Sequence, residues 1–168
     1  LRERWAAITG AGRVTPIDWD AETIQAGGVT VLHGDCAARN KEPVLLNTLT
    51  ALMQGGREQV VVQTPYIICN RAMYDALEKA GGAAQVQIIT NAPQRGANPW
   101  GCADYLNQKK AILSTGASVC EWHGERSMHT KTILIDDRFS IIGSFNWDMR
   151  SAYLDTELML LVDCPELN

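Results

Sequence analysis

The sequence contains no apolar run long enough to cross a membrane as a helix, and it shows no signal peptide. A membrane-spanning segment within these 168 residues is therefore excluded. The 5 cysteines are odd in number, scattered and without a CxxC pair, which argues against a disulfide framework or a zinc site. No carboxylates and histidines have the spacing of metal ligands either. We therefore expect free thiols in a reducing compartment and no metal site.

An excess of positive charge is also missing. The chain has 15 Lys and Arg residues against 19 Asp and Glu residues, a net charge of −4 and a pI of about 5.3. A surface devoted to nucleic acid would be basic, so the composition disfavours this function, although a local basic patch stays open. Hydrophobic residues make up 46% and charged residues 20%, which is typical of a soluble globular protein with one core.

The most informative part of the chain sets isolated polar residues around two short apolar runs. Residues 132–135 and 139–142 have the composition of buried strands, and the polar residues 136–138 between them suit a turn. The pattern predicts a β-hairpin. Because side chains two residues apart on a strand share a face, we expect His129 and Lys131 to point the same way.

The register of this hairpin decides which polar side chains meet. If residues 137–138 form a tight turn, Ser144 lies opposite Lys131, and Asn146 then lies opposite His129. A base or nucleophile, a cation and two hydrogen-bonding side chains would converge on one small area. A phosphate group needs such a set of partners. A slip of one residue would destroy the convergence, so this prediction depends on the register.

Three further residues have separate expected roles. Gly143 would allow a close approach of the backbone to a phosphate. Asp136 is seven residues from His129, about 23 Å along an extended chain at about 3.3 Å per residue, so we expect a structural carboxylate at the turn. Glu157 opens the apolar run 158–162, which we expect beside the hairpin. It is the better candidate to orient the His129 imidazole.

These residues resemble the phospholipase D superfamily, whose mark is an HxKxxxxD motif followed by GSxN. The matching residues are His129, Lys131, Asp136, Gly143, Ser144 and Asn146. The wider string 143–157 is most similar to the cardiolipin-synthase branch, as is the strand motif 63–66. Asp155 stands where that branch often has asparagine. The resemblance extends over residues 28–168.

The resemblance implies a chemistry and a set of site residues. Members of the superfamily build one active site from two copies of the motif. One histidine attacks phosphorus to form a phosphohistidine, the other protonates the leaving alcohol, and water or a second alcohol then takes the phosphoryl group without a metal or other cofactor. The implied catalytic residues are His129, Lys131, Asp136 and Glu157. The implied phosphate-binding residues are Lys131, Gly143, Ser144 and Asn146.

Only one copy of the motif is present, so we expect the chain to supply one of two half-sites and to be inactive alone. The second half-site would come from an N-terminal repeat or a homodimer mate. In a C-terminal half, His129 would be the acid–base partner, whereas a homodimer would make the two histidine roles equivalent. We expect residues 1–27 to be the end of an upstream repeat plus a linker, and residues 28–168 to be a C-terminal catalytic half, truncated at its end.

Alternating strand and helix patterns predict an α/β fold, a single repeat with a mixed sheet flanked by helices on both faces. The hairpin means that the sheet is not purely parallel. Tyr66 follows the predicted strand 60–63 at its carboxyl end, where α/β proteins place ligand residues. It therefore either lines the pocket or packs at its rim.

Three functions remain open on the sequence. The first is phosphodiester hydrolysis or phosphatidyl transfer on phospholipids, similar to cardiolipin synthase, with peripheral membrane contact on the cytoplasmic side. The second is a metal-independent nuclease or phosphodiesterase that acts as a homodimer, which the acidic pI disfavours. The third is a non-catalytic interaction domain, against which the joint presence of His129, Lys131, Asn146 and Glu157 argues.

Overall fold

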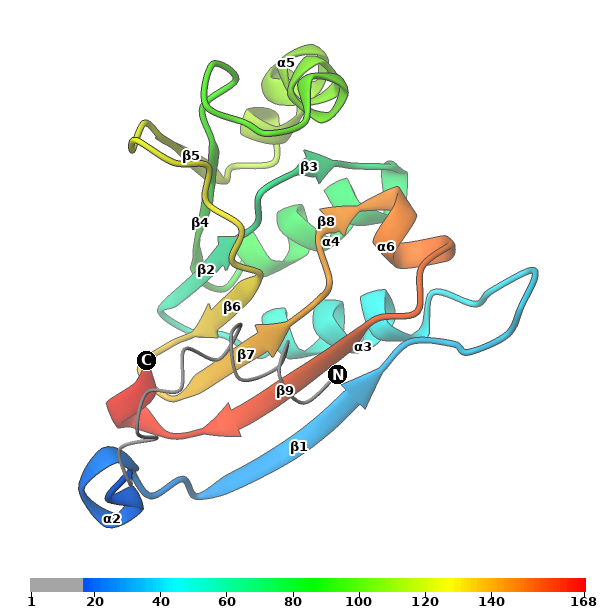
Figure 1. Ribbon diagram of the computed structural model, residues 1–168. Coiled ribbons are helices and arrows are strands. Elements are labelled where there is room, and N and C mark those ends of the chain that lie inside the picture. The colour runs from blue at the N-terminus through cyan, green and yellow to red at the C-terminus, as the bar shows by residue number, and fades with distance from the viewer. Residues whose placement is uncertain (1–16) are drawn as a thin grey trace, which may run out of the picture.

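The computed structural model describes residues 17–168, so the helix end and most of the linker predicted at the N-terminus lie outside the described residues. Seven strands form one mixed sheet in the order β1-β9-β7-β6-β2-β4-β5 (Figure 1). Their bounds are β1 (Gly28–His33), β2 (Gln59–Gln63), β4 (Gln85–Asn91), β5 (Ser118–Trp122), β6 (Thr132–Ile135), β7 (Phe139–Gly143) and β9 (Leu158–Asp163). A small second sheet pairs β3 (Ile67–Ile68) with β8 (Trp147–Asp148). The helices are α2 (Trp19–Glu22), α3 (Val44–Met53), α4 (Arg71–Gly81), α5 (Pro99–Ser114), α6 (Met149–Tyr153) and the 3-10 helix η1 (Pro165–Leu167).

The main sheet changes direction at its centre. Strands β2, β4 and β5 pair in parallel, because a helix connects each of them to the next. Strands β6, β7, β9 and β1 pair antiparallel. This arrangement confirms the predicted α/β class with a mixed sheet.

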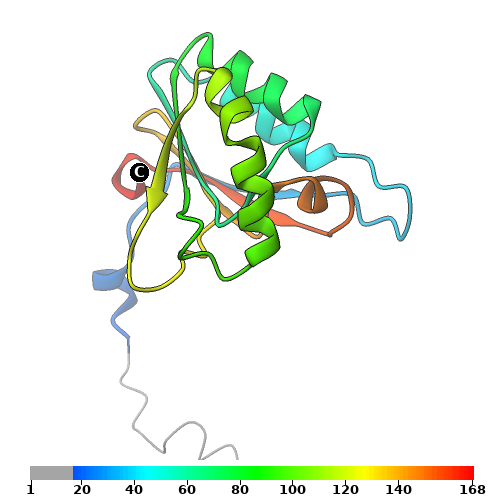
Figure 2. The ribbon, with the colours of Figure 1, turned by 90° about the horizontal axis from the view of Figure 1, so that it is seen from above.

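Helices α3, α4 and α5 lie on one face of the main sheet (Figure 2). Leu49 of α3 and Leu77 of α4 are fully buried, and they belong to the same apolar cluster as Ile112 of α5. The strands supply every second residue to this cluster, such as Ile88 in β4, because successive strand side chains point to opposite faces. The core therefore forms between this face and the three helices.

The opposite face of the sheet carries exposed apolar residues. Val31, Leu160 and Ile142 lie side by side across β1, β9 and β7, and they are 57%, 38% and 41% exposed. Within residues 17–168 no helix packs on this row, so the second helical layer predicted for the fold is not among the described elements. The row leaves an apolar surface beside the strand ends that hold the predicted site.

The hairpin of β6 and β7 has a register that differs by one residue from the predicted one. Ile135 pairs with Phe139, so the connection is the three-residue turn 136–138, and Lys131 lies opposite Gly143 rather than Ser144. The cause is the backbone at the first turn residue, which takes a left-handed conformation with φ 51°. A three-residue turn with such a residue adds one position to the loop and shifts the pairing.

Asp136 is the residue with this conformation, and its carboxylate connects the hairpin to the start of β2. Its oxygens accept the backbone N–H groups of Arg57, Glu58 and Gln59, and the shortest of these bonds is 2.8 Å, from Glu58. These donors, that of Glu58 most strongly, hold the pKa of Asp136 below its usual value. The contacts are those of a structural carboxylate.

Replacing Asp136 with asparagine is expected to lower stability at pH 7 by about 1 kcal/mol, because the backbone donors lose a charged acceptor. Since the folded-state pKa is depressed, this stabilisation is present above the ordinary pKa of the group and is lost as pH falls through the folded value. Thermal unfolding of both proteins between pH 7 and pH 2 tests this expectation. The two curves should converge in acid. Asp137→Asn, in the same turn and exposed, is the matched control, and an equal shift for it would contradict the assignment.

Candidate active site

Several strand ends meet at one edge of the main sheet. The chain enters β6 there just after His129 and Lys131, and the antiparallel β7 ends there just before Ser144. The next antiparallel strand, β9, begins there just after Glu157. The turn of the hairpin with Asp136 lies at the other end of the same two strands. The topology therefore brings most predicted site residues to one edge and leaves Asp136 at the opposite one.

The side chains of His129 and Lys131 are in contact. The ammonium nitrogen Nζ of Lys131 donates to the backbone oxygen of His129 over 2.9 Å, and it lies 3.2 Å from Nδ1 and 3.4 Å from Nε2 of the imidazole. Desolvation lowers the pKa of Lys131, while the negative charges of Glu157 and Asp148 oppose this shift. A cation and an imidazole thus face solvent side by side, with carboxylates behind them.

Glu157 is buried and bonds two serines. Its Oε2 accepts a very short hydrogen bond from the hydroxyl of Ser144, and its Oε1 accepts one from the hydroxyl of Ser151 at 2.7 Å. The expected hydrogen bond from the His129 imidazole to this carboxylate is not among those of the described residues. Both carboxylate oxygens have serine hydroxyl donors instead. Glu157 therefore binds Ser144 directly, and its negative charge acts to raise the pKa of the Lys131 ammonium group.

Ser151 was missed by the sequence reading. Its hydroxyl accepts the backbone N–H of Asn146 over 3.1 Å and the amide Nδ2 over 3.3 Å, while it donates to Glu157. It is 4% exposed and lies in α6, where the side chain of Asp148 caps its backbone N–H at 2.7 Å. One serine thereby fixes both the carboxylate and the amide of the site. The available signal was its position three residues after Asp148, an N-cap spacing.

Gly143 lies where β7 meets β9, against the backbone of its partner strand. A Cβ atom there would overlap the carbonyl oxygen of Leu158 and would come within 2.8 Å of the Cα atom of Met159. Both atoms belong to the backbone and cannot turn away as a flexible side chain would. Glycine is thus required at this position by the close approach of the two strands.

Replacing Gly143 with alanine is expected to destabilise the fold by about 2–3 kcal/mol, because β7 and β9 must separate to accept the methyl group. Gly28→Ala is the matched control, since nothing lies within 4 Å of a Cβ atom built there. That change is expected to be neutral or slightly stabilising. Chemical denaturation of the two variants measures the difference, and equal midpoints would refute the steric explanation.

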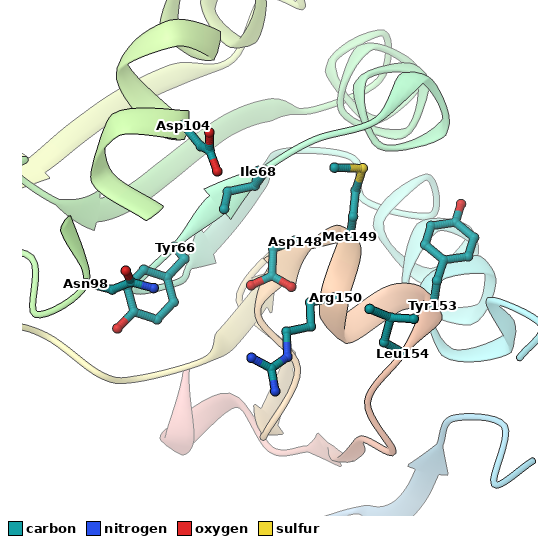
Figure 3. A pocket seen from close by; sticks show the side chains of 9 residues that line it. All are labelled: Tyr66, Ile68, Asn98, Asp104, Asp148, Met149, Arg150, Tyr153 and Leu154. Atoms are coloured by element: carbon teal, nitrogen blue, oxygen red, sulfur yellow. The ribbon is translucent and has the colours of Figure 1, made fainter. Parts of the chain in front are cut away.

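Tyr66 lies in the wall of a cavity of about 510 Å³ next to these residues (Figure 3). The cavity is bounded by the small sheet, by α6 and by the start of α5. The lining residues are Tyr66, Ile68, Asn98, Asp104, Asp148, Met149, Arg150, Tyr153 and Leu154. A second hollow, of about 500 Å³, includes His129 together with Trp122 and Arg126. The candidate site thus has one hollow beside His129 and one beside Asp148.

The donor set fits an oxyanion better than a metal ion. Lys131 supplies a positive charge. Because the register is shifted by one residue, the predicted pairing of Ser144 with Lys131 and of Asn146 with His129 is not formed. Ser144 and Asn146 still lie at this sheet edge, where the Ser144 hydroxyl donates to Glu157 and the Asn146 amide donates to Ser151. Within residues 17–168 no three His, Cys, Asp or Glu side chains are grouped to hold a metal ion. In the same residues no helix is long and apolar enough to span a membrane.

Comparison with known proteins decides the family. The model of the family described as "Cardiolipin synthase, PLD-like domain" matches residues 49–168. The chain belongs to this family. The match confirms the resemblance to the phospholipase D superfamily and to its cardiolipin-synthase branch.

Two curated relatives agree with this assignment. Cardiolipin synthase A from Cronobacter sakazakii is 26% identical over 95% of this chain and 33% of its own length. Cardiolipin synthase A from Salmonella arizonae is 25% identical over 92% of this chain and 35% of its own length. The chain therefore spans about a third of the length of these cardiolipin synthase relatives.

Solved structures show the same fold. Nuc from Salmonella typhimurium, a phospholipase D family member, superposes with a TM-score of 0.61 at 16% identity, covering 83% of this chain and 87% of that one. NucT from Helicobacter pylori gives 0.57 at 21% identity, with 83% and 89% covered. Phosphatidylserine synthase from Haemophilus influenzae gives 0.60 at 22% identity, covering 82% of this chain and 35% of that one. The family fold thus occurs both in chains of similar size and in longer ones.

Proposed function

We propose that this chain supplies one of two half-sites of an enzyme that hydrolyses or transfers phospholipid phosphodiesters through a phosphohistidine. The observation that carries the proposal is the contact between the His129 imidazole and the Lys131 ammonium group, at the sheet edge that also holds Ser144 and Asn146. The family supports a phosphodiesterase or phosphatidyltransferase class. No cofactor is needed for this chemistry.

The proposed reaction has two displacements at phosphorus. A ring nitrogen of one histidine attacks, a P–N bond forms, and the P–O bond to the leaving alcohol breaks as the other histidine gives that oxygen a proton. Water or a second alcohol then attacks the phosphohistidine. The P–N bond breaks, and the attacking hydroxyl returns its proton to the acid–base histidine. In a C-terminal half-site His129 is assigned the acid–base role.

Lys131 and the neighbouring donors stabilise the charge that develops on the phosphoryl oxygens. A phosphodiester carries one negative charge, and the transition state concentrates more charge on these oxygens. Lys131 offers a fixed cation, while Ser144 and Asn146 are held by Glu157 and Ser151. Because one lysine neutralises only part of the developing charge, a second half-site with its own lysine and histidine completes the proposed centre.

The source of the second half-site is proposed to be an N-terminal repeat or a second copy of the chain. Three observations support such a partner. The site is open to solvent at His129, and the sheet face beside it carries the exposed row of Val31, Ile142 and Leu160. The relatives are about three times as long as this chain, which leaves room for another repeat in them.

Phospholipids are favoured over nucleic acid as the substrate. The chain is acidic, with a net charge of −4, and an extended polyanion would gain little from its surface as a whole. A phospholipid presents one phosphodiester at a membrane surface, so the full-length protein is proposed to make peripheral contact with the membrane on its cytoplasmic side. A non-catalytic interaction role would leave the buried arrangement around Glu157 unexplained.

A substrate comparison on the assembled enzyme tests the proposal. Micellar phosphatidylglycerol and a single-stranded oligonucleotide are supplied at equal phosphodiester concentration in the presence of EDTA. The lipid is expected to be consumed and the oligonucleotide to remain intact. Cleavage of the oligonucleotide alone would favour a nuclease, and an absolute requirement for a divalent metal would refute the phosphohistidine mechanism.

A further inference from the structure

The cavity beside Asp148 is lined by carboxylates, whereas the proposed phosphate site carries the positive charge of Lys131. Asp148 is 7% exposed, and Figure 3 shows its carboxylate pointing into the cavity. One carboxylate oxygen accepts the N–H of Ser151 at 2.7 Å, and the other accepts no hydrogen bond within residues 17–168. Solvent reaches this second oxygen through the cavity, so it is free to accept a hydrogen bond from a ligand that replaces water there.

The remaining polar groups of the cavity suit a small polar ligand. Asn98 uses its Oδ1 to cap α5, accepting the N–H of Trp100 over 3.1 Å, so its Nδ2 amide remains as a donor. The ring of Tyr66 lies against Gly101, where a Cβ atom would come within 3.1 Å of it, so α5 fixes the orientation of this ring. Tyr66 and Asn98 both lie close to Gly101, and Figure 3 shows them at the opposite side of the cavity from Arg150, with Asp148 between.

The charge of the cavity opposes a second phosphate. Asp148 and Asp104 line it, and the guanidinium of Arg150 already pairs with Asp155 at 3.0 Å. A polynucleotide or a second phosphodiester would bring another anion close to the carboxylates, which Coulomb repulsion disfavours. An alcohol with a hydroxyl or ammonium donor would instead satisfy Asp148. Ile68, Met149 and Leu154 provide an apolar wall for its carbon atoms.

The cavity adjoins the proposed phosphate site through Ser151, whose backbone N–H donates to Asp148 and whose hydroxyl accepts the amide of Asn146. The charge of Asp148 also acts to raise the pKa of Lys131. A ligand whose phosphate contacts Lys131 can therefore place the next few atoms of its head group against Asp148. Lys131 would then bind the anionic phosphate, while the acidic wall of the cavity would bind the hydrogen-bond donor of the head group.

We propose that this cavity binds the head-group alcohol of the phosphodiester, and that Asp148 determines specificity by selecting alcohols that carry a second hydrogen-bond donor. The inference rests on the proposed function and deepens it by naming the substrate class. A second hydroxyl, as in glycerol, and a primary ammonium, as in ethanolamine, share this chemistry. The quaternary ammonium of choline has no N–H group, so it cannot donate a hydrogen bond to Asp148.

The test compares Asp148→Asn with the wild type on short-chain phosphatidylglycerol, phosphatidylethanolamine and phosphatidylcholine, using the assembled enzyme in EDTA. Asparagine caps a helix as well as aspartate does, so α6 should persist, and the melting temperature checks this. The wild type is expected to prefer each donor-bearing lipid over phosphatidylcholine by about 10-fold or more in kcat/KM, and the variant is expected to lose most of this preference. Asp148→Asn also changes the charge near Lys131, but this change affects the phosphate of all three lipids alike. The decisive quantity is therefore the ratio of kcat/KM for a donor-bearing lipid to kcat/KM for phosphatidylcholine.

If this kcat/KM ratio is the same in the wild type and in Asp148→Asn, the inference is overturned while the proposed function stays intact.

If no lipid is consumed, the proposed function fails, and binding to this chain decides the inference separately. NMR shifts are then followed during titration with glycerophosphoethanolamine and glycerophosphocholine. The first should perturb Asp148 and Tyr66 more strongly, and Asp148→Asn should remove the difference. Asp75→Asn, on the exposed side of α4, is the matched control and should change nothing. Equal perturbation by both ligands would refute a role for Asp148.

Discussion

Replacing His129 with glutamine is expected to lower kcat of the assembled enzyme by about 10³-fold or more, because the reaction loses a group that must carry a proton or attack phosphorus. The side chain is exposed, and its neighbour is the Lys131 ammonium group, so the change removes no buried contact. Glutamine keeps a polar side chain of similar length but neither exchanges protons near neutral pH nor forms a P–N bond. The melting temperature should therefore stay within about 1 °C of the wild type.

His123→Gln is the matched control for this prediction. His123 is also exposed and lies six residues earlier, before the chain reaches the sheet edge with the site. Initial rates on a soluble phosphodiester give the comparison, with unfolding followed in the same samples. If His129→Gln retains a tenth of the wild-type rate, or if His123→Gln loses as much activity as His129→Gln, then His129 takes no direct part in the reaction.

Replacing Lys131 with methionine is expected to abolish phosphate binding by this chain and to lower kcat/KM of the assembled enzyme by about 10²- to 10³-fold. Methionine is about as long as the lysine stem, so packing is kept while the charge at the oxyanion site is lost. Wild-type binding to one half-site should be weak and should weaken further with salt, because the site is open to water.

An NMR titration with inorganic phosphate measures this loss directly. Resonances of His129, Ser144 and Asn146 should move in the wild type and stay still in the Lys131 variant. Lys110→Met is the matched control, because Lys110 is an exposed lysine on α5. It should leave the titration unchanged. Phosphate-dependent shifts confined to His33 or His123 would show that the anion binds elsewhere.

The sequence predicts the hairpin well because its strands are marked by composition. Thr132–Ile135 and Phe139–Gly143 match the expected strands to within one residue. Each run of apolar residues is bounded by charged or small polar ones, and burial of alternate residues then follows from strand geometry. The structural position of Asp136 was also predictable, because extended chain length alone separates it from His129.

The register was not predictable from the hairpin alone. It depends on the left-handed backbone of Asp136, and that backbone is held by N–H groups from residues 57–59, almost 80 positions earlier in the chain. The partners of Glu157 were missed for a similar reason. Its two serine contacts form only after β7, α6 and β9 have come together. Local patterns identify elements, whereas such contacts depend on tertiary packing.

The exposed row on the second sheet face shows the same limit. Val31, Ile142 and Leu160 alternate with core residues, and the continuous apolar run at the start of β9 by itself reads as buried on both faces. Their exposure becomes visible only when the positions of the helices are known. The row and the open site lie on neighbouring parts of the molecule, which is consistent with a partner that covers both.

Turnover as a function of protein concentration tests the central claim, that this chain is one of two half-sites. The 168-residue chain is assayed with a soluble chromogenic phosphodiester in EDTA, and sedimentation velocity gives the monomer and dimer fractions of the same samples. The account predicts no turnover by the monomer, and any activity should rise in proportion to the dimer fraction. Turnover that persists at concentrations where only the monomer is present would contradict it.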